Sequence, residues 1–342
     1  MCLDKLYMQR CLDLAIQGKP DAFPNPLVGC VIVKNNRIIS EGYHKKFGEK
    51  HAEIEAINKI KDKTVLEGSD IYINLEPCSH YGKTPPCVNE IIKYKFNKIV
   101  IGTQDPFKEV NGKGIQKLKK YNLKINCLEN ECKKINKRFF INNTKNRPYI
   151  ILKWAQTKNN FIGNKSFKKS RLIISNNKSL KMSHKWRSTE AAILIGKNTA
   201  LKDNPRLTTR LCKGRNPIRI ILDQNLELKK TLNVFNKEVE TLIINNKTNA
   251  KKDNVQYIKI SNDKYFLQTL CSLLYKRKIY SIIVEGGAAI LKLFIKEKLW
   301  DEARVFTSQK IVKEGLTAPL IKNKKYKKYS VDTDSLTIYS NN

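Results

Sequence analysis

The sequence contains no long run of uncharged apolar residues. None approaches the ~20 residues that a helix needs to span a bilayer, so we expect no membrane span. The first twenty residues carry an early acidic residue, Asp4, and no extended apolar segment, which argues against a secretory signal. The nine cysteines are odd in number and scattered along the chain. They fit reduced thiols in the cytoplasm better than a disulfide framework.

Acidic residues are also scarce. The 31 Asp and Glu residues stand against 66 Lys and Arg residues, which gives a formal net charge of +35. Only 12 of the basic residues are Arg, and the Lys excess, with abundant Asn and Ile, is typical of compositional drift on solvated surfaces. A nucleic-acid surface is the alternative, because a basic face attracts phosphates. We favour drift and expect neither a nucleic-acid nor a membrane partner, although the charge would attract a phosphorylated small molecule.

The length of 342 residues predicts two domains, at about 100–200 residues per domain. The polar segment 143–148 ends in Pro148 and marks the boundary, so we expect domains at 1–146 and 147–342. In both, β-branched runs alternate with helical periodicity, which is typical of an α/β fold around a central sheet. The expected strands are 28–34, 37–43, 70–76, 98–106 (ending in a turn), 148–155, 191–196, 218–223, 241–246, 281–284 and 301–311. The expected helices are 4–17, 51–60, 88–96, 132–143 and 288–300, and the Lys cluster 322–329 is interpreted as a solvated loop.

Four residues of the first domain form a constellation with metal chemistry. His51 and Glu53 begin a helix as H-x-E, Cys78 follows a strand as P-C, and Cys87 opens another helix. Two thiolates and one imidazole bind zinc tetrahedrally and leave a fourth position for water, whose pKa the metal lowers toward ~7. A carboxylate held off the metal, here Glu53, can carry protons from the nucleophile to the leaving amine. The sequence therefore predicts a zinc deaminase with His51, Cys78 and Cys87 as ligands, and His80 as an alternative ligand.

These motifs resemble the cytidine deaminase superfamily, whose signature is H-x-E followed by P-C. The long spacing in P-C-S-H-Y-G-K-T-P-P-C, together with segments 24–33, 41–53 and 104–106, resembles the bifunctional deaminase–reductase family of riboflavin biosynthesis. The resemblance implies a cytidine-deaminase-like α/β/α domain that acts on a pyrimidine carrying a phosphoribosylamino group. It implies that Asn25 binds the pyrimidine, and Lys83 could reach the phosphate. The alternatives are a turn residue at Asn25 and a solvated loop lysine at Lys83.

The clearest local pattern of the second domain is Glu285-Gly286-Gly287, between an expected strand and helix. Free backbone amides at such a turn can bind phosphate. Tight turn packing explains the glycines equally well, and the full G-x-G-x-x-G dinucleotide fingerprint is absent.

Four segments of this domain resemble the reductase half of the same family: 148–153, 193–210, 217–223 and 284–287. The resemblance implies a dihydrofolate-reductase-like α/β domain that uses NADPH to reduce a ribosyl chain to a ribityl chain. Near NADPH it places Ala155, Leu172, Thr199, Asp203 and Gly287. Near the substrate it places Ser170, Arg187, Leu207, Arg210 and Glu285, of which the two arginines suit phosphate because guanidinium binds it in a bidentate way.

Two departures from the family pattern concern this reductase half. Leu172 stands where the family has Trp, Ile174 stands where it has Thr, and residues 157–160 replace its Ser-x-Asp-Gly. Leu offers less stacking area than an aromatic ring, so we expect weaker NADPH binding, with a decayed reductase as the alternative. A tRNA deaminase and a non-catalytic zinc scaffold are further alternatives. The long Cys–Cys spacing argues against the first and the retained Glu53 against the second. The resemblance also implies a homodimer through the second domain.

Overall fold

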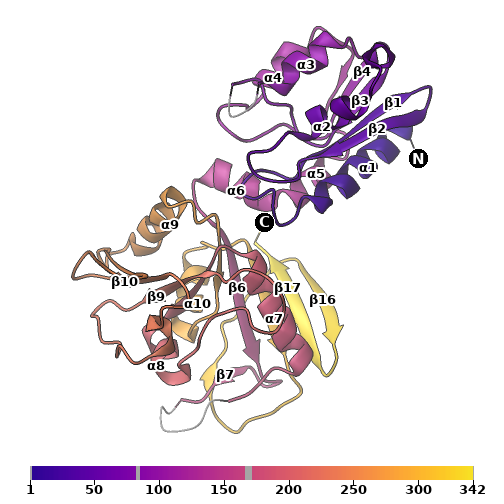
Figure 1. Cartoon of the computed structure of the whole chain (residues 1–342). Helices are drawn as coiled ribbons and strands as arrows, with labels where there is room; N and C mark the ends of the chain where they lie inside the picture. Colours follow the sequence, from indigo (N-terminus) through magenta and orange to yellow (C-terminus); the bar gives the residue numbers. More distant parts are fainter. Residues whose placement is uncertain (1, 82–84, 166–171, 342) are drawn as a thin grey trace. The chain divides into compact units, whose positions relative to one another are not determined.

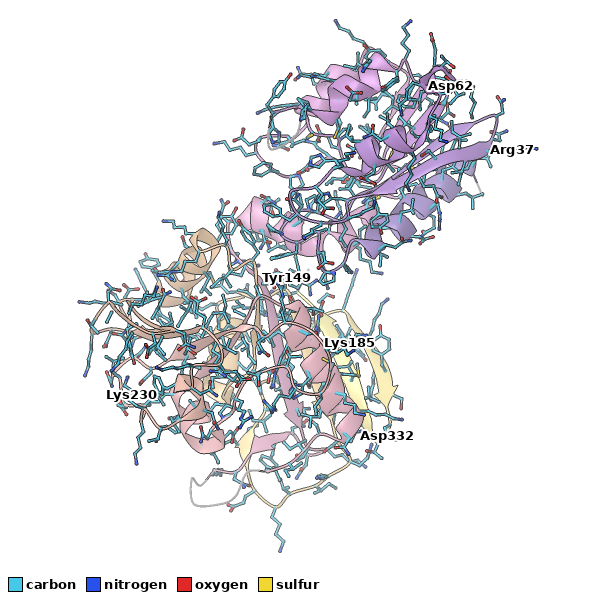
Figure 2. All side chains as sticks on the ribbon, viewed as in Figure 1. Arg37, Asp62, Tyr149, Lys185, Lys230 and Asp332 are labelled. Carbon is cyan, nitrogen blue, oxygen red and sulfur yellow. The ribbon has the colours of Figure 1, made fainter. Side chains whose placement is uncertain are left out.

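Two compact units make up the chain, unit 1 (Met1–Asn146) and unit 2 (Arg147–Asn342). The computed structural model describes residues 2–81, 85–165 and 172–341 (Figure 1). The division follows Asn146, which ends the last helix of unit 1 in the left-handed conformation, at φ 49°. Within the described ranges, no helix is long and apolar enough to cross a membrane. Basic side chains such as Arg37 of unit 1 and Lys230 of unit 2 lie at the surface (Figure 2).

Among its described residues, unit 1 is built on a five-stranded sheet in the order β2-β1-β3-β4-β5. Strand β1 is antiparallel to β2 and β3, whereas β3, β4 and β5 are parallel. The strands are β1 (Gly29–Lys34), β2 (Arg37–Tyr43), β3 (Asp70–Ile73), β4 (Lys98–Ile101) and β5 (Leu123–Lys124). The helices are α1 (Leu3–Gln17), α2 (Ala52–Lys59), α3 (Cys87–Lys93), α4 (Lys113–Leu118), α5 (Glu129–Ile135) and α6 (Lys137–Lys145), with a 3-10 turn at Lys63–Leu66.

Alternating apolar residues bury both faces of this sheet, because successive strand side chains point to opposite sides. Ile71 and Ile73 of β3 pack with residues of α2, α3 and α4 on one face. Tyr72 of β3 and Val100 of β4 pack with residues of α1 and α5 on the other. The result is the α/β/α domain that the sequence predicted.

The main differences from the sequence prediction lie where the chain leaves regular structure. The helix expected at 132–143 is two helices, α5 and α6, which meet at Asn136. At this break the Asn136 side chain forms two hydrogen bonds with the backbone of Leu27. Its amide oxygen accepts from the Leu27 N–H at 2.8 Å, and its NH₂ donates to the Leu27 carbonyl at 2.9 Å. The strand expected at 70–76 ends at Ile73, whereas the segment 98–106 is, as expected, a strand that ends in a turn, with β4 ending at Ile101. The chain leaves the sheet after each of these two strands. After β3, the Asn74 amide oxygen accepts a hydrogen bond from the backbone N–H of Gly29 at 2.7 Å.

Asp4 of α1 is a buried carboxylate that stabilises unit 1 only above acidic pH. It accepts hydrogen bonds from Lys98, Lys124 and Tyr72 at 2.6, 2.8 and 2.8 Å. Burial alone would raise the pKa of Asp4, but the bonds from Lys124, Lys98 and Tyr72 outweigh it and lower the pKa from 3.8 to about 2. The group therefore stabilises the folded state above its unfolded pKa, and this contribution disappears as the pH falls from 3.8 toward about 2.

Asp4→Asn should accordingly lower the free energy of unfolding of unit 1 at neutral pH, and the difference from wild type should shrink below about pH 4. Urea unfolding followed by circular dichroism checks this. Trp fluorescence reports unit 2 separately, because Trp154, Trp186 and Trp300 all lie there. A difference that stays constant from neutral to acidic pH would contradict the assigned role of Asp4.

Unit 2 is built, in its described part, on a ten-stranded sheet in the order β11-β12-β10-β9-β8-β13-β6-β14-β17-β16. Neighbouring strands from β12 to β14 are parallel, and β11, β17 and β16 add antiparallel pairings at the ends. The strands of this sheet are β6 (Tyr149–Gln156), β8 (Ala192–Gly196), β9 (Ile218–Leu222), β10 (Thr241–Asn245), β11 (Ala250–Lys252), β12 (Val255–Lys259), β13 (Ser281–Val284), β14 (Glu302–Thr307), β16 (Tyr326–Val331) and β17 (Asp334–Ser340). Strands β7 (Phe161–Gly163) and β15 (Leu316–Thr317) form a separate antiparallel pair. The helices are α7 (Asn177–Thr189), α8 (Lys197–Asp203), α9 (Phe266–Lys276) and α10 (Ala288–Lys296), with a 3-10 turn at Asn233–Phe235.

Helices α9 and α10 cover one face of this sheet, and α8 with the loops around it covers the other. Helix α7 packs Met182 and Trp186 against Phe306 of β14 and the β16–β17 hairpin. The Lys cluster 322–329 was predicted as a loop, but its second half forms the edge strand β16. Pairing with β17 along the whole strand outweighs its charged composition, and the lysines point into solvent.

Candidate functional site

Three predicted zinc ligands from separate elements converge in unit 1. His51 precedes α2 as its N-cap, Cys78 lies in the loop after β3, and Cys87 is the first residue of α3. Their ligand atoms all lie within 4.8 Å of one another. The alternative ligand His80 is outside this group, which covers only the described residues, and its ring packs against Phe107 with centroids 6.1 Å apart.

The geometry of the group suits thiolate chemistry. The Cys78 and Cys87 sulfurs lie 3.5 and 3.3 Å from Nδ1 of His51, and the Cys87 backbone N–H donates to the Cys78 sulfur at 3.3 Å. The Cys87 thiol, the His51 ring and that N–H lower the pKa of Cys78, which favours its thiolate form. Contact with this thiolate raises the pKa of Cys87. Two sulfurs and one imidazole nitrogen form a donor set that matches a zinc site with one open position.

Glu53 is placed beside these ligands by the first turn of α2, two residues after His51. Its side chain is only 3% exposed. Burial raises the pKa of Glu53, and the positive charge of His51 partly opposes that rise. A carboxyl whose pKa lies closer to neutrality exchanges protons more effectively near pH 7, as a proton carrier in deamination must.

Asn25 reaches the same region through a residue that the sequence analysis missed, His44. The side-chain amide nitrogen of Asn25 lies 3.0 Å from Nε2 of His44, and Nδ1 of His44 lies 3.0 Å from the carbonyl of Lys50. Since a carbonyl only accepts, Nδ1 carries the proton and Nε2 accepts from Asn25. The His44 ring packs edge-on against that of His51, with centroids 5.6 Å apart. Burial lowers the pKa of His44, which favours this neutral form. Lys83 lies outside the described residues.

In unit 2, Glu285 and Arg187 form a buried ion pair. Arg187 donates from Nε and Nη2 to the two oxygens of Glu285 at 2.9 and 2.7 Å, and Lys153 of β6 lies 4.0 Å from the same carboxylate. Burial of Glu285 favours its neutral form, but the charges of Arg187 and Lys153 outweigh it and lower the pKa of Glu285 to about 2. Sequence reasoning missed Lys153, although it lies in the strand 148–155 that the sequence predicted.

Arg210 and Leu207 lie on the loop after α8, close to this pair. The carbonyl of Thr208 accepts from Arg187 at 3.5 Å, and the Thr208 hydroxyl accepts from Arg210 at 2.9 Å. The backbone N–H of Arg210 donates to Nδ1 of His184 at 3.0 Å. Burial, followed by the charges of Arg187 and Arg210, lowers the pKa of His184 to about 4, so this histidine is neutral. Leu207 is buried, and Ser170 lies outside the described residues.

The residues predicted near the cofactor occupy several elements of unit 2. Gly287 precedes α10 with φ 63°, and a Cβ there would lie 3.4 Å from the Thr199 hydroxyl, so the start of α10 faces α8. Asp203 is four residues beyond Thr199, on the same side of α8. Ala155 lies at the end of β6, paired with Phe306. Leu172 is half-buried and Ile174 is buried.

Known protein families account for both units. Residues 1–103 match the family model described as the cytidine and deoxycytidylate deaminase zinc-binding region. Residues 148–337 match the RibD C-terminal domain. The riboflavin biosynthesis protein RibD of Aquifex aeolicus is 37% identical over 322 residues, which cover 92% of this chain and 89% of that protein. The chain belongs to the RibD family.

Other RibD proteins support this assignment along the whole chain. RibD of Bacillus amyloliquefaciens is 32% identical and covers 93% of this chain and 88% of its own length. A solved diaminohydroxyphosphoribosylaminopyrimidine deaminase/5-amino-6-(5-phosphoribosylamino)uracil reductase of Thermotoga maritima is 34% identical, with a TM-score of 0.85 over 99% of this chain and 98% of that one. RibD of Acinetobacter baumannii is 28% identical, with a TM-score of 0.84 over the same shares. The chain is thus a bifunctional deaminase and reductase of riboflavin biosynthesis, with a dihydrofolate-reductase-like second unit.

Proposed function

We propose that unit 1 deaminates 2,5-diamino-6-(5-phosphoribosylamino)pyrimidin-4-one to 5-amino-6-(5-phosphoribosylamino)uracil, and that unit 2 then reduces the ribosyl chain to a ribityl chain with NADPH. The observation that carries the deaminase assignment is the convergence of His51, Cys78 and Cys87 within 4.8 Å, beside the buried Glu53. The similarity of the whole chain to RibD proteins supports the order of the two reactions and the identity of the substrate.

The residues of unit 1 divide the work of deamination. His51, Cys78 and Cys87 would hold zinc, which supplies a hydroxide at neutral pH and a positive charge. Glu53 takes the proton of the attacking water and delivers it to the leaving amine, so that ammonia departs. Asn25, oriented by its bond to His44, binds the pyrimidine edge, and Lys83 binds the phosphate.

The residues of unit 2 bind an anionic substrate beside a hydride donor. The phosphorylated ribosyl chain is contacted by five residues, Ser170, Arg187, Leu207, Arg210 and Glu285. The positively charged guanidinium of Arg210 binds the phosphate. NADPH, which supplies the hydride, is held by five other residues: Ala155, Leu172, Thr199, Asp203 and Gly287. Because Gly287 lacks a Cβ, the backbone at the start of α10 is open toward Thr199, as a bound phosphate requires. Leu172 replaces an aromatic residue, and NADPH binds more weakly as a result.

Two assays on one zinc-quantified sample test this proposal. With the diaminopyrimidinone ribose phosphate as substrate, we expect ammonia release, followed by loss of NADPH absorbance. Ammonia release alone would refute the proposed reductase activity, and the absence of ammonia despite one bound zinc per chain would refute the proposed substrate.

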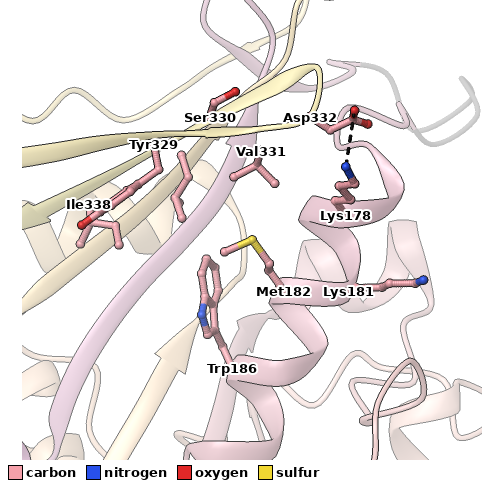
Figure 3. Close-up of a pocket in the computed structure, with 10 residues that line it drawn as sticks. Lys178, Lys181, Met182, Trp186, Tyr329, Ser330, Val331, Asp332 and Ile338 are labelled. Atoms are coloured by element: carbon pink, nitrogen blue, oxygen red, sulfur yellow. Dashed lines mark ion pairs between the residues drawn. The ribbon is translucent and has the colours of Figure 1, made fainter.

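We propose that the chain forms a homodimer through unit 2, in which a second copy covers a groove beside α7. The groove has a volume of 640 Å³ and lies between α7 and the β16–β17 hairpin (Figure 3). Its lining is mainly apolar and includes Met182, Trp186 and Tyr329. The groove lies beside β16, the last strand of the sheet, on which Tyr326 and Tyr329 are exposed. An apolar groove beside an open strand edge is a surface that a second copy of the chain can cover.

Tyr329→Glu should therefore shift the protein toward the monomer, because it would bury a charge at the centre of the proposed interface. Size-exclusion chromatography with light scattering measures the result. Tyr265→Glu, an equally drastic change at another exposed tyrosine of unit 2, should leave the dimer intact. A wild-type monomer at micromolar concentration would refute the interface.

A further inference from the structure

Glu76 is a buried acidic residue that the proposed reaction does not use. It precedes Cys78 by two residues, in the E-P-C motif, and its side chain is 3% exposed. A buried carboxylate is unfavourable unless hydrogen bonds compensate for its lost hydration. Its partners therefore show what the residue does in the fold.

Four backbone N–H groups donate to this one carboxylate. One oxygen accepts from Gly114 at 2.8 Å and Ile115 at 3.1 Å, and the other accepts from Gly112 at 2.9 Å and Asp105 at 3.1 Å. All four donors belong to the segment 105–115, which runs from the Q-D-P motif to the first turn of α4. Glu76 thus fastens this whole segment to the strand that leads to Cys78.

The glycines of the segment show how closely it approaches. Gly112 has φ 87°, a conformation that side chains disfavour. A Cβ at Gly114 would lie 2.3 Å from the carbonyl oxygen of Pro77, which leaves no room for a side chain. Two further contacts join the same surfaces, since Lys117 donates to the Ser79 carbonyl at 3.2 Å and Phe107 packs against His80.

The fastened segment carries a second buried carboxyl group, that of Asp105, which interacts electrostatically with Glu76 and Cys78. Asp105 is 6% exposed, and one of its oxygens accepts from the backbone of Phe107 at 2.7 Å. Its backbone N–H is one of the four that Glu76 holds. Loss of the Glu76 carboxylate would therefore release Asp105 and the loop beside Cys78 together.

We propose that Glu76 is a positioning residue for the deamination: its carboxylate holds the segment 105–115, with Asp105, as a wall of the substrate site beside Cys78. The inference rests on the proposed deaminase function. It assigns Glu76 to catalytic geometry and not to zinc retention, since none of its four bonds reaches a metal ligand.

Glu76→Gln tests the proposal with little change in volume. The amide NH₂ would face two N–H donors in place of an acceptor, so that half of the fastening is lost. We expect kcat for ammonia release to fall on the order of 10–100-fold per zinc-loaded chain, as for misplacement of site groups by about 1 Å. We expect zinc content to stay at one per chain and NADPH oxidation with supplied deaminated product to be unchanged. Hydrogen exchange of the peptide covering residues 105–115 should rise.

Two further variants make the test specific. Glu67→Gln alters an exposed carboxylate of unit 1 that pairs only at 3.5 Å with exposed Lys95, and should change none of these readouts. Gly114→Ala places a methyl group against the Pro77 carbonyl oxygen and should therefore displace the same segment and reproduce the loss of kcat. The double variant, Glu76→Gln with Gly114→Ala, should have a kcat little lower than that of either single variant. Zinc loss in proportion to the loss of activity, or an unchanged kcat with faster exchange, would overturn the positioning role. A wild-type chain without ammonia release would instead refute the proposed function.

Discussion

Glu53→Gln is expected to slow ammonia release strongly while zinc remains bound. Gln preserves the volume of the side chain in its buried position on α2, and His51, Cys78 and Cys87 are unchanged. An amide cannot take a proton from water and pass it to the leaving amine, a role that contributes typically about 10²–10⁴-fold to a rate. We therefore expect kcat to fall by at least about 10²-fold.

The same chain supplies the controls for this experiment. NADPH oxidation, measured with the deaminated product supplied, should be unaffected, because it depends on unit 2. Glu55→Gln changes the next acidic residue of the same helix. The Glu55 carboxylate forms an ion pair with Lys45, with 2.9 Å between the charged atoms, and the variant should keep nearly full deaminase activity. A Glu53→Gln enzyme with wild-type kcat would show that another group carries the proton.

Glu285→Gln should destabilise unit 2 and abolish NADPH oxidation. Arg187 donates two hydrogen bonds to the Glu285 carboxylate, and Lys153 lies 4.0 Å from it. The substitution would leave both positive charges without their shared negative partner. Removal of one partner from a buried ion pair typically destabilises a protein by about 3–5 kcal/mol. The pKa of Glu285, about 2, shows how strongly the two cations favour its charged form.

Trp fluorescence during urea unfolding measures this change, because all three Trp residues lie in unit 2. Glu227→Gln is the matched control, since it breaks an exposed pair with Lys197, 2.6 Å apart, of a kind worth about 0–1 kcal/mol. Deaminase activity should survive both changes. A Glu285→Gln protein as stable as the Glu227→Gln control would contradict the role given to the ion pair.

The candidate deaminase site shows how far local sequence patterns reach. His51 and Glu53 lie at a helix start, Cys78 after a strand and Cys87 at the next helix start, so element type and residue chemistry together indicated the candidate metal ligands. The side chains that complete the surroundings were not indicated. The bond from Asn25 to His44 joins residues 19 apart in a loop-rich region, and no periodicity marks it.

Local pattern and tertiary packing thus determined different things about this protein. The sequence by itself determined the α/β character of both units, the approximate boundary near residue 146 and the chemistry of the metal-ligand set, because these depend on residue types and on periodicity within a single element. Only the tertiary structure decided the order of the ten strands in unit 2, the break between α5 and α6 at Asn136, the meeting of Arg187 with Glu285 across 98 residues and the four bonds to Glu76. Each of these depends on contacts between distant parts of the chain, whose energies outweigh local propensity and leave no signal in a short window of sequence.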